Sequence, residues 1–206
     1  VGYTVDSNII RNSIKIVAGC DKQTTIKIAE IYKSIPGIKV KTVASIKVAE
    51  AVKLMENSQR DLLIAFANEY SEFCTQIGIN INDVIVAAST KWNFSQVYPG
   101  LVGGHCISVD PYYLLQKAFD IGLQLPLVST ARIVNENKVS KVVNRFVDKL
   151  READVPNENN KILIIGFSYK KNCADIRNTK VANLVKGLEN HGYKVDVYDP
   201  LVNRLA

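Results

Sequence analysis

The longest helical pattern in the chain is the feature that most constrains its fold. Apolar residues recur at helical spacing from Ser45, a favourable N-cap residue, to Ile77, and the pattern stops at Gly78. About 32 residues at 1.5 Å per residue make a helix of about 48 Å, which is too long for one small core. We therefore expect this helix to form the spine of an all-helical domain. We also expect a homodimer whose contacts are carried by helix 45–77.

The residues before this helix show the pattern of an α/β segment. Residues 13–18 and 38–43 have the β-branched or alternating composition of strands, and residues 22–33 between them have helical spacing. Pro36 and Gly37 break the helix before the second strand. The order is therefore strand, helix, strand.

A second α/β segment follows the helical middle of the chain. Residues 156–160 form a polar linker, after which strands at 161–167 and 194–198 enclose a helix at 179–191. Parallel strands need helices on both faces and neighbouring strands, so each segment is an incomplete α/β domain. The predicted fold class is mixed α and α/β: an all-helical central domain with a long spine helix, flanked by incomplete Rossmann-like segments. The predicted domains are residues 1–44, 45–155 and 160–206.

Shorter helices are predicted inside the central domain, at residues 82–88, 112–121 and 127–153. The second of them is expected to have Asp110 as its N-cap, Pro111 in its first turn and Gly122 as its stop. Residues 99–110 are a glycine-rich loop without periodicity.

Composition and charge exclude several classes of protein. No apolar stretch approaches the roughly 20 residues of a membrane-spanning helix, and no signal peptide is visible. The four cysteines have no CxxC spacing, so we expect neither a metal site nor a disulfide framework, and a reducing cytoplasm is the expected location. The net charge of +6 comes from scattered lysines without an arginine-rich block, so no nucleic-acid partner is expected.

The loop from Gly103 to Pro111 is the segment most suggestive of chemistry. Two glycines let the backbone approach a ligand closely, and Cys106 lies just ahead of a helix N-terminus, where a thiolate is favoured. The alternative is that Cys106 is a small buried side chain in a tight turn.

Lys53 and Asn57 are a second candidate pair. They lie four residues apart on one helix face, where a lysine beside an amide could stabilise a developing oxyanion. The alternative is that both side chains are simply solvated.

Four motifs, taken in order, give the chain a family resemblance. They are Lys53–Asn57, Thr90–Phe94, Pro99–Leu114 and Gly166–Thr179. Together they closely resemble the nucleotide-sugar 6-dehydrogenases, which include UDP-glucose and GDP-mannose dehydrogenases. The segments His105–Tyr113 and Thr90–Phe94 are most similar to the branch acting on UDP-N-acetylglucosamine or UDP-N-acetylgalactosamine.

This resemblance implies an NAD-dependent, two-step oxidation of the sugar C6 hydroxyl to a carboxylate, in the synthesis of polysaccharide precursors such as those of capsules. It implies that Cys106 is the nucleophile, that Lys53 and Asn57 hold the C6 oxygen, and that Asp110 orients water or assists proton transfer. The implied substrate-binding residues are Val97, Tyr98, Pro99, Gly100, Leu101, Val102, Gly103, Tyr169 and Lys170. Arg177 is implied to contact NAD.

The chain also departs from the family pattern. It contains no GxGxxG turn to seat the NAD pyrophosphate, it lacks the catalytic glutamate that the family carries ahead of the segment aligned with Val1, and Tyr98 stands where members of the branch often have arginine. A second hypothesis is therefore a truncated, non-catalytic fragment that binds a sugar nucleotide or mediates oligomerisation. The sugar epimer and the glycan are left open.

Overall fold

The computed structural model describes residues 14–155 and 160–202. It divides the chain into two compact units, Val1–Glu56 and Asn57–Ala206, and the division falls within one long helix.

The first unit contains the predicted strand–helix–strand segment. Strand β1 (Ile14–Val17) pairs in parallel with β2 (Lys39–Thr42), and α2 (Lys22–Lys33) connects them. The Asp21 side chain caps α2 by accepting a hydrogen bond of 2.7 Å from the Thr24 N–H. The predicted elements are confirmed, although Ser13, at the predicted start of the first strand, lies outside the described residues.

The long helix is present as α3 (Ile46–Gln76), which has 31 residues. The hydroxyl of Ser45 accepts from the Val48 N–H at 3.3 Å, as expected of an N-cap. Gly78 ends the helix in the left-handed region, with φ of 75°, and the Ile79 N–H returns to the Cys74 carbonyl. The expected spine helix is therefore confirmed within one residue at each end.

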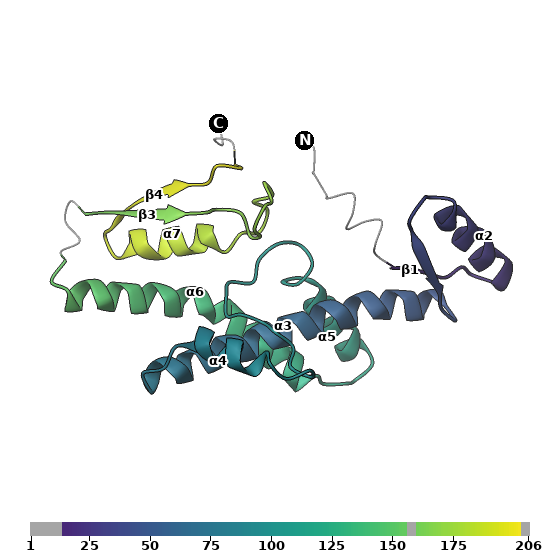
Figure 1. Cartoon of the computed structure of the whole chain (residues 1–206), viewed down its shortest axis with the longest axis horizontal. Coiled ribbons are helices and arrows are strands. Elements are labelled where there is room, and N and C mark those ends of the chain that lie inside the picture. Colours follow the sequence, from purple (N-terminus) through teal and green to yellow (C-terminus); the bar gives the residue numbers. More distant parts are fainter. Residues whose placement is uncertain (1–13, 156–159, 203–206) are drawn as a thin grey trace. The chain divides into compact units, whose positions relative to one another are not determined.

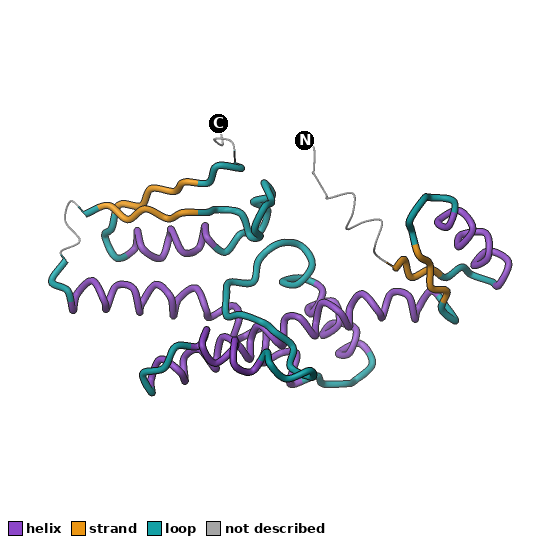
Figure 2. The backbone as a smooth tube through the Cα atoms, in the orientation of Figure 1, coloured by secondary structure: helices purple, strands orange, loops and turns teal. Residues whose placement is uncertain are grey.

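Three further helices follow: α4 (Ile81–Ala88), α5 (Asp110–Asp120) and α6 (Pro126–Glu152). A long irregular segment joins α4 to α5 (Figure 2). The expected role of Asp110 as N-cap is wrong, because Asp110 is the first helical residue and the N-cap is Val109, without a side-chain capping bond. The physical reason is that the Asp110 carboxylate accepts a hydrogen bond from Asn57 on α3 instead.

The C-terminal elements are β3 (Lys161–Ile165), α7 (Val181–Asn190) and β4 (Lys194–Tyr198), with the two strands parallel and Lys161 opposite Lys194. The strand ends two residues earlier than predicted and the helix begins two residues later. Thr179 accounts for part of this difference, since its hydroxyl donates to the Phe167 carbonyl at 2.7 Å and ties the two flanking loops together. Most of the predicted linker, residues 156–159, lies outside the described residues.

The main apolar core of the second unit lies between α6 and α7. Its buried members are Val139, Val143, Val147, Leu188 and Tyr193, and the strands contribute side chains from their inner face. Helix α7 thus lies between α6 and the β3–β4 pair (Figure 1). Over the described residues, no helix combines the length and apolar character needed to cross a membrane.

Candidate functional site

The turn that carries Cys106 is built from two glycines that leave no room for a side chain. A Cβ at Gly103 would lie 2.8 Å from the Asn178 carbonyl oxygen, and one at Gly104, where φ is +81°, would lie 2.7 Å from the Tyr169 ring. Cys106 is exposed, and its carbonyl accepts from the N–H groups of Val109 and Asp110 at the start of α5. The turn therefore presents a free thiol just ahead of a helix N-terminus, and the alternative of a buried cysteine is wrong.

Asn57 and Asp110 meet beside this turn. Asn57 is 4% exposed on α3, and its side-chain amide donates a hydrogen bond to a carboxylate oxygen of Asp110 in the first turn of α5. Two residues that the sequence separates by 53 positions are therefore in direct contact. Lys53 is an exposed residue of α3 in the first unit, and its role stays a prediction.

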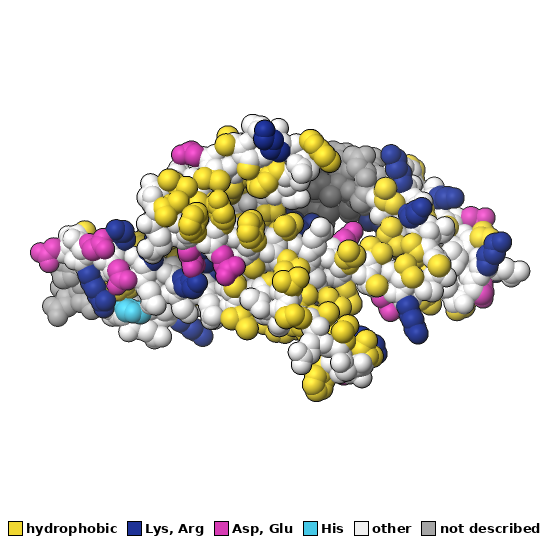
Figure 3. Space-filling view, turned by 90° about the horizontal axis from the view of Figure 1, so that it is seen from below, with side chains coloured by type: hydrophobic (Ala, Val, Ile, Leu, Met, Phe, Trp, Pro, Cys, Tyr) yellow, Lys and Arg dark blue, Asp and Glu magenta, His cyan; other side chains and the backbone are white. Residues whose placement is uncertain are grey.

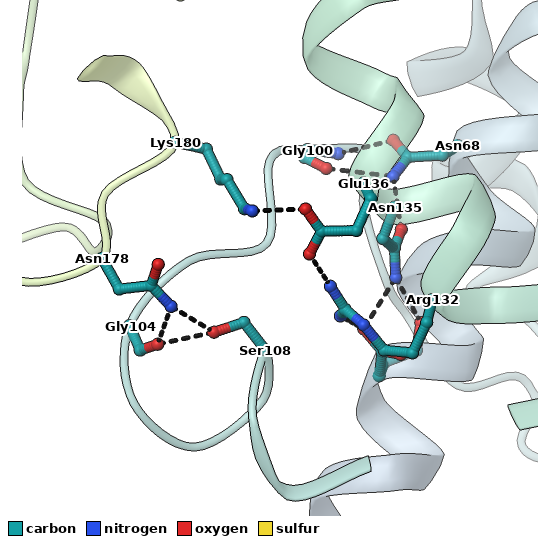
Figure 4. Close-up of polar contacts among 10 residues, drawn as sticks. Asn68, Gly100, Gly104, Ser108, Arg132, Asn135, Glu136, Asn178 and Lys180 are labelled. Carbon is teal, nitrogen blue, oxygen red and sulfur yellow. Dashed lines mark hydrogen bonds and ion pairs between the residues drawn. The ribbon is translucent and has the colours of Figure 1, made fainter. Parts of the chain in front are cut away.

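The predicted substrate loop, residues 97–103, is fixed through its backbone at Gly100. The Asn68 side chain accepts from the Gly100 N–H at 2.9 Å and donates to the Gly100 carbonyl at 3.0 Å (Figure 4). Val102 is buried and Leu101 packs against the apolar core, whereas Tyr98 is 47% exposed. The end of the loop at Leu101 and Val102 is therefore held by packing, whereas Tyr98, near the other end, is open to solvent. Val97, Pro99 and Gly103 are half-buried.

Asn68 belongs to a buried polar network between α3 and α6. It donates to Asn135 at 2.9 Å, and Asn135 donates to the Asp61 carboxylate at 2.8 Å. Arg132 donates to the same carboxylate at 2.6 Å, and both charged side chains are at most 2% exposed. Burial raises the pKa of Asp61, while the Arg132 charge and the Asn135 amide act in the opposite direction.

The network extends to the C-terminal region. Arg132 and Lys180 each pair with one oxygen of Glu136, so a residue at the start of α7 is linked to α6 (Figure 4). Sequence reasoning missed every member of this network. The one available signal was the helical spacing of polar residues at 57, 61 and 68 on the face of α3 that is buried.

Tyr169 and Lys170, the predicted C-terminal substrate residues, differ in their surroundings. The Tyr169 ring lies against Gly104 of the cysteine turn, and burial together with the neighbouring Cys173 and Asp175 raises the pKa of its hydroxyl. Lys170 is exposed and lines a cavity of about 310 Å³ at the ends of β3 and β4. The Asp199 carboxylate, which also lines this cavity, accepts from the N–H groups of Phe167 and Ser168, and these bonds lower the pKa of Asp199.

Arg177, the predicted cofactor residue, forms a two-point contact with Asp175. Its Nε and one terminal nitrogen donate to the two carboxylate oxygens at 2.9 and 2.8 Å. These contacts and a weaker one from His105, at 3.4 Å, hold the pKa of Asp175 well below its usual range. The loop before α7 is thus tied to His105, the neighbour of Cys106.

The residues of the chain do not by themselves account for NAD binding. The sequence contains no GxGxxG turn, and Arg177, the only residue assigned to NAD, is already engaged by Asp175. No group of three or more possible metal ligands is found among residues 14–155 and 160–202.

Comparison with known proteins identifies two matching family domains. The central domain of the UDP-glucose/GDP-mannose dehydrogenase family matches residues 47–137, and the UDP binding domain of that family matches residues 163–206.

Two curated relatives illustrate the similarity. The UDP-N-acetyl-D-glucosamine 6-dehydrogenase of Salmonella typhi is 41% identical over 194 residues, which are 94% of this chain and 46% of that protein. Protein CapL of Staphylococcus aureus is 38% identical over 185 residues, 90% of this chain and 44% of that protein. The chain therefore spans slightly under half the length of these relatives.

Solved structures show the same fold. The UDP-D-ManNAc dehydrogenase of Pyrococcus horikoshii has a TM-score of 0.87 at 29% identity, over 96% of this chain and 46% of that one. The NDP-N-acetyl-D-galactosaminuronic acid dehydrogenase of Methanosarcina mazei Go1 has a TM-score of 0.84 at 29% identity, over 97% and 44%. The predicted fold class is confirmed.

Proposed function

Since the chain belongs to the UDP-glucose/GDP-mannose dehydrogenase family, we propose that it carries the substrate side of an NAD-dependent UDP-N-acetylhexosamine 6-dehydrogenase. The reaction converts the sugar C6 hydroxyl to a carboxylate in polysaccharide precursor synthesis. The observation that carries the proposal is the exposed thiol of Cys106, on a turn beside the Asn57–Asp110 contact and the Tyr169 ring. The relatives named for UDP-N-acetylglucosamine, UDP-N-acetylmannosamine and capsule synthesis support this substrate class.

In the proposed mechanism, Cys106 acts on the aldehyde formed by the first oxidation. Its thiolate adds to C6 and gives a thiohemiacetal, whose oxidation leaves a thioester, and water then cleaves the thioester and releases the thiol. Asn57 and Lys53 would stabilise the negative charge that develops on the C6 oxygen. Asp110, held by Asn57, would orient the water.

NAD would supply the acceptor for the four electrons released by this conversion, two in each oxidation. Because this chain lacks a glycine turn for the pyrophosphate, no step of hydride transfer is derived from its residues. Arg177 remains the proposed NAD contact across the site.

We further propose the three-domain division at residues 1–44, 45–155 and 160–206. In this division the loop 97–103 holds the sugar, while Tyr169 and Lys170 hold the nucleotide side of the substrate. The cavity at the ends of β3 and β4, beside Lys170, supports that assignment, because ligands of parallel sheets bind at the carboxyl ends of the strands.

A homodimer through helix 45–77, in the cytoplasm, completes the proposal. Helix α3 exposes three aromatic rings, and Tyr70 contacts the other two, with centroid separations of 5.8 Å for Phe66–Tyr70 and 5.5 Å for Tyr70–Phe73. Further hydrophobic side chains are exposed on the face drawn in Figure 3. Sedimentation as a monomer at micromolar concentration would contradict the dimer.

The central test uses Cys106→Ser in a fusion protein, in which this chain follows a dinucleotide-binding domain with the GxGxxG turn. We expect the unsubstituted fusion to form NADH with a UDP-N-acetylhexosamine, and Cys106→Ser to lose at least about a thousandfold in kcat, as removal of a nucleophile does. Cys20→Ser is the matched control, because Cys20 is also an exposed free thiol. Full activity of Cys106→Ser contradicts the mechanism.

A second candidate function is a non-catalytic module that binds a sugar nucleotide or mediates oligomerisation. The missing GxGxxG turn favours it. Calorimetry on the 206-residue chain distinguishes the two: the module binds UDP-N-acetylglucosamine without NAD, whereas NAD binding with turnover by the chain alone refutes the module.

A further inference from the structure

Asn178 contacts the cysteine turn from the opposite side of the proposed substrate site. It lies in the loop before α7, more than 70 positions from Gly104 and two residues before Lys180. Figure 4 shows its side chain directed at Gly104 and Ser108. The sequence places it within the motif Gly166–Thr179 but assigns it no role.

Three hydrogen bonds join this loop to the turn, and a fourth lies within the turn. The Asn178 carbonyl accepts from the Gly104 N–H at 3.2 Å, and the Asn178 side-chain amide donates to the Gly104 carbonyl and to the Ser108 hydroxyl, each at 2.9 Å. The Ser108 hydroxyl in turn donates to the Gly104 carbonyl at 2.6 Å. Both Ser108 and Gly104 are buried, so these contacts are shielded from water.

The orientation of the Asn178 amide is determined by this network. The Gly104 carbonyl can only accept, and the Ser108 hydroxyl already spends its hydrogen on that carbonyl, so both groups need a donor. Only the NH₂ side of an amide supplies two donors at that point. A carboxylate of the same shape would face two acceptors.

The backbone at Asn178 is also unusual. Its φ of 54° lies in the left-handed region, which asparagine adopts more readily than most other residues that are not glycine. The Asn178 carbonyl is the group that would meet a Cβ at Gly103 at 2.8 Å. Backbone and side chain of one residue thus fit against both glycines of the turn.

We propose that Asn178 is a positioning residue that holds the Gly104–Ser108 turn, and with it Cys106, in the geometry required for attack on the substrate. This inference rests on the proposed function only in naming Cys106 as the nucleophile. The C-terminal region therefore contributes to the site twice, through substrate contacts and through the shape of the turn that bears the thiol.

The test compares Asn178→Asp and Asn178→Gly with a matched control, Asp154→Ala. Asp keeps the shape and the left-handed backbone but removes both donors, and Gly keeps the backbone contacts but removes the side chain. Asp154 also has a left-handed backbone, with φ of 53° at the exposed end of α6, so Asp154→Ala shows the effect of altering such a residue away from the turn.

The first measurement is amide hydrogen exchange of the 206-residue chain, followed peptide by peptide. Both Asn178 variants should exchange about tenfold faster in the peptide 101–110, as expected for loss of a shielded hydrogen bond, with the peptides of α3 and α6 unchanged. Asp154→Ala should leave peptide 101–110 unchanged.

The second measurement is steady-state kinetics of the fusion protein. A positioning role predicts that kcat falls about tenfold or more in both Asn178 variants while KM for the UDP-sugar stays within about twofold. Unchanged exchange in peptide 101–110, an equal rise in all peptides, or an unchanged kcat overturns the inference. If the unsubstituted fusion is inactive, the proposed function fails, and the exchange measurement alone decides whether Asn178 holds the turn.

Discussion

The two halves of α6 differ in whether they bury polar side chains. In the first half, Arg132 and Asn135 are at most 2% exposed and bind Asp61 on α3. In the second half, Val139, Val143 and Val147 pack against Leu188 of α7. The first half also buries Val128 and Ala131, so it combines polar and apolar burial, whereas the second half buries valines alone. We call them the polar half and the apolar half.

The difference shows how a single helix can fix a loop with one half and pack a core with the other. Apolar packing is non-directional, so the valine half can stabilise the unit without fixing any neighbouring loop in detail. Buried hydrogen bonds are directional and costly when incomplete, so the polar half fixes partners such as Asn68 and, through it, Gly100. The loop 97–103, proposed to hold the sugar, is attached to the polar half through Asn68.

Breaking the ion pair in the polar half should have the largest effect. Arg132→Met leaves the Asp61 carboxylate buried without its cation, and we expect a loss of about 3–5 kcal/mol in the free energy of unfolding. Urea denaturation of the chain measures it. A loss under about 1 kcal/mol would show that the pair is effectively solvated.

Leu188→Ala, on α7 where it packs against the apolar half of α6, is the matched control, since it should cost about 2–5 kcal/mol by opening a cavity. Under conditions where both variants remain folded, we expect Leu188→Ala to keep its affinity for UDP-N-acetylglucosamine and Arg132→Met to lose part of it. Equal losses of affinity would remove the distinction between the two halves.

A smaller effect is expected from Asn68→Ala, which leaves both backbone groups of Gly100 without their partner. We expect a loss of about 1–3 kcal/mol in stability and a weaker binding of the sugar nucleotide in calorimetry. Asn80→Ala is a suitable control, because Asn80 caps α4 and, among the described residues, forms no hydrogen bond with Gly100. Removing this cap should lower the free energy of unfolding by about 1 kcal/mol. Unaltered binding in Asn68→Ala would show that the Asn68–Gly100 hydrogen bonds do not contribute to binding of the sugar nucleotide.

The smallest effect, and one that depends on pH, is expected at Asp175. Its pKa is lowered in the folded chain by Arg177 and His105, so the ionised carboxylate stabilises the fold above its ordinary pKa of about 4. This stabilisation is lost as pH falls below about 4 toward the folded-state pKa. Asp175→Asn should therefore lower Tm at pH 7, and the difference from the unsubstituted chain should shrink toward pH 3. A difference independent of pH would contradict the assignment.

Much of the fold could be read from local patterns. Helix α2 and strand β4 begin and end at the predicted residues, since each is bounded by clear turn signals in the sequence. The start of α5 was predicted wrongly because Asp110, a good capping residue locally, is recruited by Asn57 from 53 positions away. Helix and capping propensities depend on the local sequence, so they contain no information on such a distant partner.

The residues of the candidate site were predictable where they belong to local motifs, but their distant partners were not. Cys106, Asn57 and Asp110 belong to short motifs, and the structure shows the thiol exposed and the other two in contact. Asn68 carries no local signal, and Asn178 lies within the motif Gly166–Thr179 without a role assigned to it, since the importance of both arises only from the backbone groups that they meet.

The sequence by itself determined the long α3 helix, the two strand–helix–strand segments and the cysteine loop, because periodicity, caps and turn glycines act over a few residues. Only the tertiary structure decided which side chains hold that loop. Hydrogen bonds between Asn178 and Gly104, or between Asn68 and Gly100, join positions more than 30 residues apart, and they form only when packing brings the elements together. A buried polar group gains from such a partner only in the folded chain, where water no longer competes for it.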